Sequence, residues 1–268
     1  MAHRSTTPPR CLRELQRLQD HPPRPGIGLQ QCPGSKHQSK GLASKQPSNP
    51  LGTVLDREAL TDSLAFTNDK NIHLICDEIY SATVFSQPDY ISIAEIAQES
   101  ANCRRDMIHI VYSLSKDLGF PGFRVGVVYS YNDTVVNCAR KMSSFGLVST
   151  QTQHLIASML SDDVFVDRFL SESAKRLGTR HGFLSRGLAQ VGIGSLKSNA
   201  GLYCWMDLRR LLKEATFEAE MELWRVINKR GEAQRRLAHR SIAEPGWFRV
   251  CFANMDDETM RGCVGEDT

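Results

Sequence analysis

The stretch that decides the fold is Y-S-L-S-K-D-L-G-F-P-G-F-R-V-G, residues 112–126 of a 268-residue chain. An apolar run at 108–112 leads into it and predicts a buried strand. Ser113 and Ser115 lie two residues apart, so we expect them on the same side of an extended backbone. A second apolar run, 125–129, follows the stretch and predicts another strand.

One chemistry explains the residue types in this stretch. Lys116 can form a Schiff base with an aldehyde cofactor. The hydroxyls of Ser113 and Ser115 and the guanidinium of Arg124 can hold a phosphate. The glycines of the loop 119–122 let the backbone approach a ligand. These features indicate pyridoxal phosphate, and the alternative for S-x-S-K alone is a solvated surface loop.

An acidic partner for the cofactor follows another apolar run. Residues 71–76 predict a short strand that ends at Asp77-Glu78-Ile79-Tyr80. Open α/β sheets bind ligands at the carboxyl ends of their strands. Asp77 could be an ordinary strand-end acid facing water. We favour a functional role because the phosphate-type loop comes one strand later.

Composition restricts the classes of protein and of site. The apolar fraction is 41%, and no apolar run approaches the ~20 residues of a membrane helix. The N-terminus lacks the apolar stretch of a secretory signal. The eight cysteines form no C-x-x-C pair and no cluster at zinc spacing. We therefore expect a cytoplasmic protein with reduced thiols, no metal site and no membrane partner.

The net positive charge lies in two segments, 1–45 and 229–240, and the rest of the chain is net negative. Neither contains an aromatic residue or a regular apolar period, whereas a nucleic-acid surface combines basic and aromatic residues on folded structure. We therefore expect no nucleic-acid partner. We predict that residues 1–40 are disordered or foreign to the fold and that 229–243 are irregular. An organellar transit peptide is the alternative for residues 1–39.

The remaining sequence alternates strands and helices, which predicts an α/β fold. We expect a partial large domain at 41–150, a mostly parallel sheet with helices, and at 151–268 a helical linker with a smaller α+β domain. Asp56 is the expected N-cap of a helix through Leu64. The other expected helices are 92–97, 134–142, 151–160, 164–191 and 217–228, and the other expected strands are 201–208 and 247–255.

The chain resembles the 1-aminocyclopropane-1-carboxylate (ACC) synthases of plants, which are fold-type I pyridoxal-phosphate enzymes related to class I/II aminotransferases. Six motifs carry the resemblance. They are P-S-N-P-L-G-T at 47–53, C-D-E-I-Y at 76–80, the stretch 112–126, R-K-M-S-S-F-G-L-V-S at 140–149, L-K-S-N-A-G-L-Y-C-W-M-D-L at 196–208 and E-P-G-W-F-R-V-C-F-A-N-M at 244–255.

The resemblance implies a role for each matching residue. Lys116 would hold the cofactor as a Schiff base and move the substrate α-proton. Asp77 would pair with the protonated pyridine nitrogen. Tyr80 and Asn49 would hydrogen-bond the ring oxygen beside the linkage. The pairing of Asp77 with the ring nitrogen would keep the ring an electron sink.

The resemblance also implies how phosphate and substrate are held. Ser113, Ser115 and Arg124 would bind the phosphate, and Arg249 would take the substrate carboxylate. The implied reaction converts S-adenosyl-L-methionine to ACC and methylthioadenosine, a step of ethylene biosynthesis linked to fruit ripening.

The chain departs from the family in ways that affect activity. Family members extend far upstream of Gly41, and residues 1–39 and 229–240 do not match them. We therefore expect an N-terminally truncated protein whose isolated chain has negligible synthase activity. Two alternatives stay open: a class I/II aminotransferase, or a catalytically incompetent fragment. A homodimer, or a heterodimer with an intact relative, is the expected assembly.

Overall fold

The computed structural model describes residues 41–229, 237–239 and 244–254. They divide into two compact units. The first unit contains residues 41–46, 55–79 and 91–153, and the second contains 47–54, 80–90 and the described residues from 154 onward. The domain ranges expected from the sequence are contiguous, whereas each unit combines separate stretches of chain.

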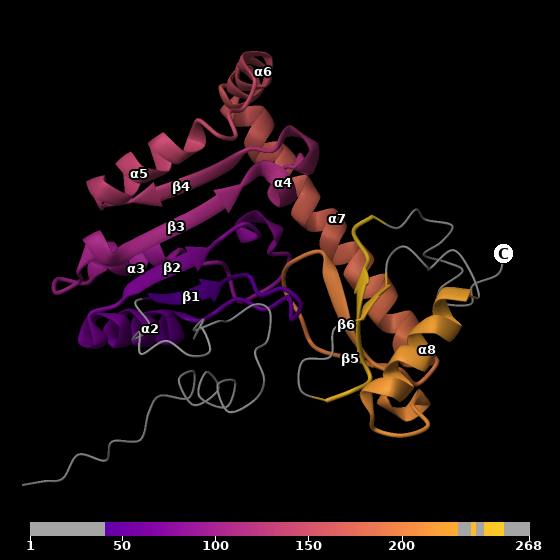
Figure 1. Ribbon diagram of the computed structural model, residues 1–268. Helices are drawn as coiled ribbons and strands as arrows, with labels where there is room; N and C mark the ends of the chain where they lie inside the picture. The colour runs from indigo at the N-terminus through magenta and orange to yellow at the C-terminus, as the bar shows by residue number, and fades with distance from the viewer. Residues whose placement is uncertain (1–40, 230–236, 240–243, 255–268) are drawn as a thin grey trace, which may run out of the picture. The chain divides into compact units, whose positions relative to one another are not determined.

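The first unit is built on a four-stranded sheet in the order β1-β2-β3-β4 (Figure 1). The strands are β1 (Gly41–Lys45), β2 (His73–Asp77), β3 (Ile108–Ser113) and β4 (Gly126–Ser130). The first three are parallel, and β4 is antiparallel to β3. This mostly parallel sheet confirms the expected α/β class. β1 was not predicted, because G-L-A-S-K carries only one large apolar side chain.

Two helices supply the core of this unit. α2 (Arg57–Lys70) begins at Asp56, whose carboxylate accepts from the amide of Ala59 at 2.8 Å, as the N-cap prediction requires. α3 (Ile93–Glu99) begins at Ser92. Apolar side chains of both helices pack on alternate residues of the strands. The buried cluster is Leu42, Leu60, Leu64, Leu74, Cys76, Ile93, Ile96, Ala97, Ile108 and Ile110.

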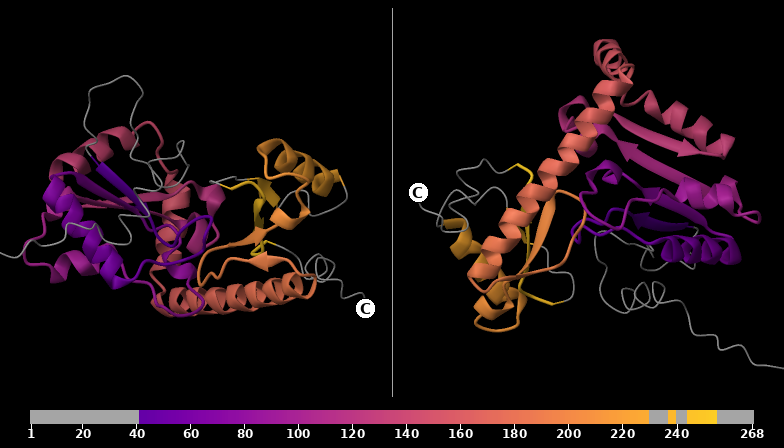
Figure 2. Two further views of the ribbon diagram at one scale, coloured as in Figure 1. Left: turned by 90° about the horizontal axis from the view of Figure 1, so that it is seen from below. Right: turned by 180° about the vertical axis from the view of Figure 1, so that it is seen from behind.

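The second unit contains an antiparallel sheet in the order β5-β6-β8-β7. Its strands are β5 (Gly194–Ser195), β6 (Tyr203–Asp207), β7 (Leu237–His239) and β8 (Trp247–Cys251). α7 (Asp163–Gln190) is a single helix of 28 residues, visible along its length in Figure 2. Its carboxyl-terminal half packs Leu177, Leu184 and Leu188 against buried residues of the sheet. α8 (Phe217–Lys229) adds partly buried apolar side chains to this cluster.

Segment 47–54 belongs to the second unit through backbone contacts. The carbonyl of Gly52 accepts from the amides of Asn199 and Ala200, at 2.8 and 3.0 Å. Gly52 has φ +68°, and a Cβ there would lie 2.7 Å from the carbonyl oxygen of Ala200. Both constraints require glycine at this position.

Segment 80–90 joins the same unit. The amide of Phe85 donates to the carbonyl of Asn199 at 2.9 Å. The Asn199 side chain donates to the carbonyls of Ser86 and Pro88. Asn199 therefore fixes a loop that lies more than a hundred residues earlier in the chain.

The expected helices and strands are confirmed, with ends shifted by a few residues. The remaining elements are short or linking. They are α4 (Leu114–Asp117), α5 (Asp133–Ser143), α6 (Thr150–Leu160), and the 3₁₀ turns η1 (Ser81–Thr83), η2 (Arg105–Met107), η3 (Pro121–Phe123) and η4 (Arg209–Leu211). None of the helices in the described part of the chain is long and apolar enough to cross a bilayer.

One expectation is wrong in part. Residues 229–243 were expected to be irregular, but Lys229 ends α8 and Leu237–His239 pairs with β8 as strand β7. The sequence signal was weak because β7 has only three residues. The remaining residues of that segment, and the expected disorder of 1–40, lie outside the described residues.

Candidate functional site

Asp77 ends β2 at the carboxyl edge of the parallel strands. The register places it beside Lys45 of β1, and the Lys45 Nζ and Asp77 Oδ2 atoms are 2.9 Å apart. The other carboxylate oxygen accepts from the amide of Ile79 at 3.3 Å. About a third of the Asp77 side chain is exposed, at 30%. The carboxylate is therefore fixed yet accessible.

Glu78 has a different role from its neighbour. Its carboxylate is buried and accepts from the Ser92 hydroxyl at 2.9 Å and from the amide of Ile93 at 3.0 Å. A carboxylate at this position accepts from an amide that has no partner within the helix. The positive end of the helix dipole stabilises its negative charge. Glu78 therefore caps α3, and Asp77 is the strand-end acid available to a ligand.

The serine pair lies on a turn and not on extended backbone, so that expectation is wrong. Ser113 ends β3 and is the N-cap of α4, where Ser115 is already helical. The two hydroxyl oxygens are still 2.7 Å apart. Because the Ser113 hydroxyl donates to the carbonyl of Val125 at 2.9 Å, Ser115 donates to Ser113. The helical turn brings the pair together, as the phosphate role requires.

Lys116 lies on the same short helix, α4, and is half-buried. Within the described residues its amine has no hydrogen bond or ion pair. The next residue, Asp117, is buried, and its carboxylate together with burial raises the pKa of Tyr112, burial being the larger cause. Sequence reasoning missed Asp117. An amine free of partners is the state that a nucleophilic lysine needs.

Arg124 follows the serine turn, and among the described residues its side chain forms no hydrogen bond with either serine. It is exposed, and it adopts a left-handed conformation with φ 56°. Its Nη1 donates to the carbonyl of Pro121 at 2.7 Å. The phosphate role expected of Arg124 stays a prediction.

The second unit brings together three other expected site residues. Arg249 Nη1 donates to Asn49 Oδ1 at 2.9 Å, and Asn49 Nδ2 donates to the Tyr80 hydroxyl at 3.1 Å. The Arg249 guanidinium lies over the ring of Tyr203, 4.1 Å from its centroid. Burial, and then Tyr203, raise the pKa of Tyr80, whereas Asn49 and Arg249 lower it. Sequence reasoning missed Tyr203, which starts β6 opposite β8.

The expected site residues thus form two groups. Asp77, Ser113, Ser115, Lys116 and Arg124 belong to the first unit. Asn49, Tyr80 and Arg249 belong to the second and share hydrogen bonds. The prediction that the cofactor residues of both groups line one concavity stays a prediction.

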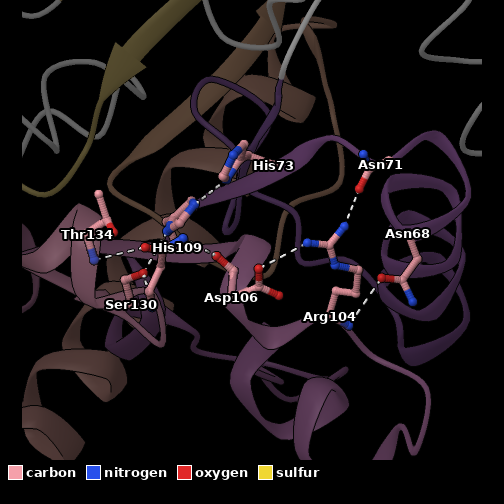
Figure 3. A network of polar contacts seen from close by, with 9 residues as sticks. Asn68, Asn71, His73, Arg104, Asp106, His109, Ser130 and Thr134 are labelled. Atoms are coloured by element: carbon pink, nitrogen blue, oxygen red, sulfur yellow. Dashed lines mark hydrogen bonds and ion pairs between the residues drawn. The ribbon is translucent and has the colours of Figure 1, made fainter.

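A separate polar cluster lies at the opposite ends of the same strands (Figure 3). His73 Nδ1 is 2.7 Å from His109 Nε2, and the two rings stack at 5.0 Å. His109 Nδ1 is 2.8 Å from the Ser130 hydroxyl of β4. Burial, followed by His73, lowers the pKa of His109, and Asp106 raises it. These histidines join β2, β3 and β4 at the edge away from Asp77.

Comparison with known sequences gives close relatives. A 1-aminocyclopropane-1-carboxylate synthase of Nicotiana tabacum is 64% identical over 225 residues, which are 82% of this chain and 45% of the relative. 1-Aminocyclopropane-1-carboxylate synthase 2 of Solanum lycopersicum is 63% identical over 226 residues, 82% of this chain and 46% of the relative. The chain therefore spans less than half the length of these relatives, and the resemblance read from the motifs is confirmed.

Solved structures show the same fold at low identity. An aromatic aminotransferase from Pyrococcus horikoshii matches 85% of this chain and 58% of its own, with TM-score 0.72 and 19% identity. An aspartate aminotransferase from Thermus thermophilus with maleate matches 85% and 56%, with TM-score 0.71 and 19% identity. The family described as aminotransferase class I and II matches residues 28–265. The chain belongs to the class I and II aminotransferase family.

Proposed function

We propose that this chain carries the cofactor-anchoring and substrate-binding elements of a pyridoxal-phosphate-dependent ACC synthase acting on S-adenosyl-L-methionine. The relatives at 63–64% identity bear that name and support the proposal. The observation that carries it is the Lys116 amine, which has no hydrogen bond or ion pair among the described residues and lies on a turn that begins with two adjoining hydroxyls. Asp77 lies one strand away, in register with Val111.

The residues fit the cofactor's functional groups. Ser115 can turn its hydroxyl from Ser113 to a phosphate at little cost, because the hydrogen bond that it gives up is replaced. The accessible Asp77 carboxylate can accept from a protonated ring nitrogen. When bound, pyridoxal phosphate supplies an electron-accepting ring that stabilises negative charge at the substrate α-carbon.

The chain's own side chains then carry the proton and hold the substrate. Lys116 would hold the cofactor through its aldehyde and, once released from it, would take the α-proton of S-adenosyl-L-methionine. The α-carbon closes on the γ-carbon while the carbon–sulfur bond breaks and methylthioadenosine leaves. Arg249, held by Asn49 and Tyr203, takes the substrate carboxylate in a bidentate pair.

The assembly and location are part of the same proposal. The proposed assembly is a homodimer or a heterodimer with an intact relative; the chain spans less than half the length of the relatives that it matches. The described cysteines are free thiols, which supports a cytoplasmic location.

Covalent trapping tests the cofactor role. The purified chain is incubated with pyridoxal phosphate, reduced with borohydride and digested, and the modified lysine is located by mass spectrometry. We expect the label on Lys116, its loss in Lys116→Ala and its retention in Lys141→Ala, where an exposed helix lysine is removed. Equal label in Lys116→Ala would contradict the proposal.

Product analysis separates the synthase from an aminotransferase. Methylthioadenosine release from S-adenosyl-L-methionine supports the synthase, whereas keto-acid-dependent exchange of the amino group supports the aminotransferase. We expect turnover by the isolated chain close to that of Lys116→Ala. Mixing with an intact relative then tests whether the chain contributes to a shared assembly.

A further inference from the structure

The carboxylate proposed to hold the cofactor nitrogen already has a cationic partner. Lys45 is the last residue of β1, and parallel pairing places it directly beside Asp77. The ammonium and the carboxylate are 2.9 Å apart, and their side chains are 27% and 30% exposed. The pair is therefore open enough to separate without a buried charge being left behind.

Lys45 is held in this position by the backbone that follows it. The amide of Gln46 donates to the carbonyl of Asp77 at 3.0 Å, which continues the strand pairing past Lys45. The Gln46 side chain is fully buried and donates to the carbonyl of Ile91 at 2.9 Å. The Lys45 side chain thus starts from a fixed point, and its proximity to Asp77 follows from strand register.

The neighbouring charged residues Glu78 and Lys116 do not compete with Lys45 for the Asp77 carboxylate. Glu78 is turned to the N-terminus of α3, and the Lys116 amine has no ion pair among the described residues. A protonated ring nitrogen would need the same carboxylate, and two cations beside one carboxylate repel each other.

We propose that Lys45 competes with the cofactor's ring nitrogen for Asp77, so that the cofactor binds only when this ion pair opens. The inference rests on the proposed cofactor function and adds a residue that regulates the site. Because partly exposed ion pairs are weak, the competition lowers affinity by a factor of about 2 to 5.

Titration with pyridoxal phosphate, followed by absorbance and fluorescence, tests the competition. We expect Lys45→Met to bind 2 to 5 times more tightly than the wild-type chain. Lys70→Met is the matched control, because Lys70 forms an exposed ion pair with Asp69 on α2. That variant should bind as the wild type does. In an Asp77→Asn background, Lys45→Met should give no gain.

The outcomes separate the two proposals. Equal or weaker binding by Lys45→Met, or the same gain in the Asp77→Asn background, overturns the competition while the cofactor function stands. Borohydride-fixed label on Lys45 in place of Lys116 also overturns it. Binding to none of the variants removes both the cofactor function and this inference.

Discussion

Two parts of the first unit differ in how their apolar residues are covered. In strands β1 to β3 the side chains that face α2 and α3 are buried. Residues 119–153 contain β4, α5 and the first residues of α6, yet none of them is buried. The second part has regular secondary structure without a core of its own.

The exposed residues of the second part are large and apolar. In β4, Val127 and Val128 are 46% and 49% exposed, and adjacent strand residues point to opposite faces. Both faces of β4 are therefore about half exposed. Phe145 and Leu147 are exposed still further. The periodicity of a sequence therefore predicts a helix or strand, but it does not predict whether another surface covers that helix or strand.

The largest expected effect is the difference in stability between two Leu→Ala variants, one in each part. Leu60→Ala, at a site 1% exposed, should lower the free energy of unfolding by about 2–5 kcal/mol, because it removes buried contacts and leaves a cavity. Leu147→Ala, at 73% exposure, should change it by no more than about 0.5 kcal/mol. Urea unfolding followed by circular dichroism measures both. Equal losses would mean that the two parts are equally packed.

Hydrogen exchange compares the strands directly. The amides of His73–Asp77 should exchange at least about ten times more slowly than those of Gly126–Ser130. β2 has strand neighbours on both sides, whereas β4 pairs with β3 alone among the described strands. Mass spectrometry of peptides from both strands checks this, and equal protection would show that β4 is covered in solution.

Self-association should follow from the exposed strand. An uncharged apolar edge favours pairing between chains, so Val128→Lys should lower the weight-average mass of the chain in sedimentation. Its free energy of unfolding should change by about 0.5 kcal/mol or less. Asn137→Lys adds the same charge on α5 as a control and should leave the mass unchanged. An unaltered mass in Val128→Lys would show that strand β4 does not mediate self-association.

The smallest expected effect concerns His109, where the two parts meet. Its folded pKa is lowered by burial and by His73, so the unfolded chain binds more protons as the pH falls through about 6.5. Stability should therefore decline as the pH falls below that value. In His109→Gln the decline should be shallower when the free energy of unfolding is measured from pH 8 to 5. An unchanged slope would exclude His109 as its source.

Much of the fold followed from the sequence. Apolar residues at helical spacing predicted α2, α7 and α8. The cap at Asp56 predicted the residue at which α2 begins. β1 was missed because its pairing with β2 compensates for a weak local signal. The assignment of 47–54 to the second unit depends on contacts with Asn199, which lie far away in the chain.

The site divides in the same way. Motifs selected Asp77, Lys116 and Arg249 as candidate site residues because residue types and loop signals are local. They did not show that Ser115 is helical, because two serines at i and i+2 fit an extended backbone as well as a strand end followed by a helical turn. Lys45 could not be found from the sequence because strand register brings it beside Asp77. Tyr203 could not be found because its ring meets the Arg249 guanidinium only once β6 pairs with β8, where the direct strand partner of Arg249 is Trp205.

The alternation of the chain between its two units has a consequence for synthesis. Residues 47–54 leave the ribosome early, yet their hydrogen-bond partners at Asn199 and Ala200 emerge about 150 residues later. At roughly 5–20 residues per second, that interval is on the order of ten seconds. During this interval the carbonyl of Gly52 in the P-S-N-P-L-G-T segment lacks its native hydrogen-bond donors. The second unit can therefore fold only after residues 199–200 have been synthesised.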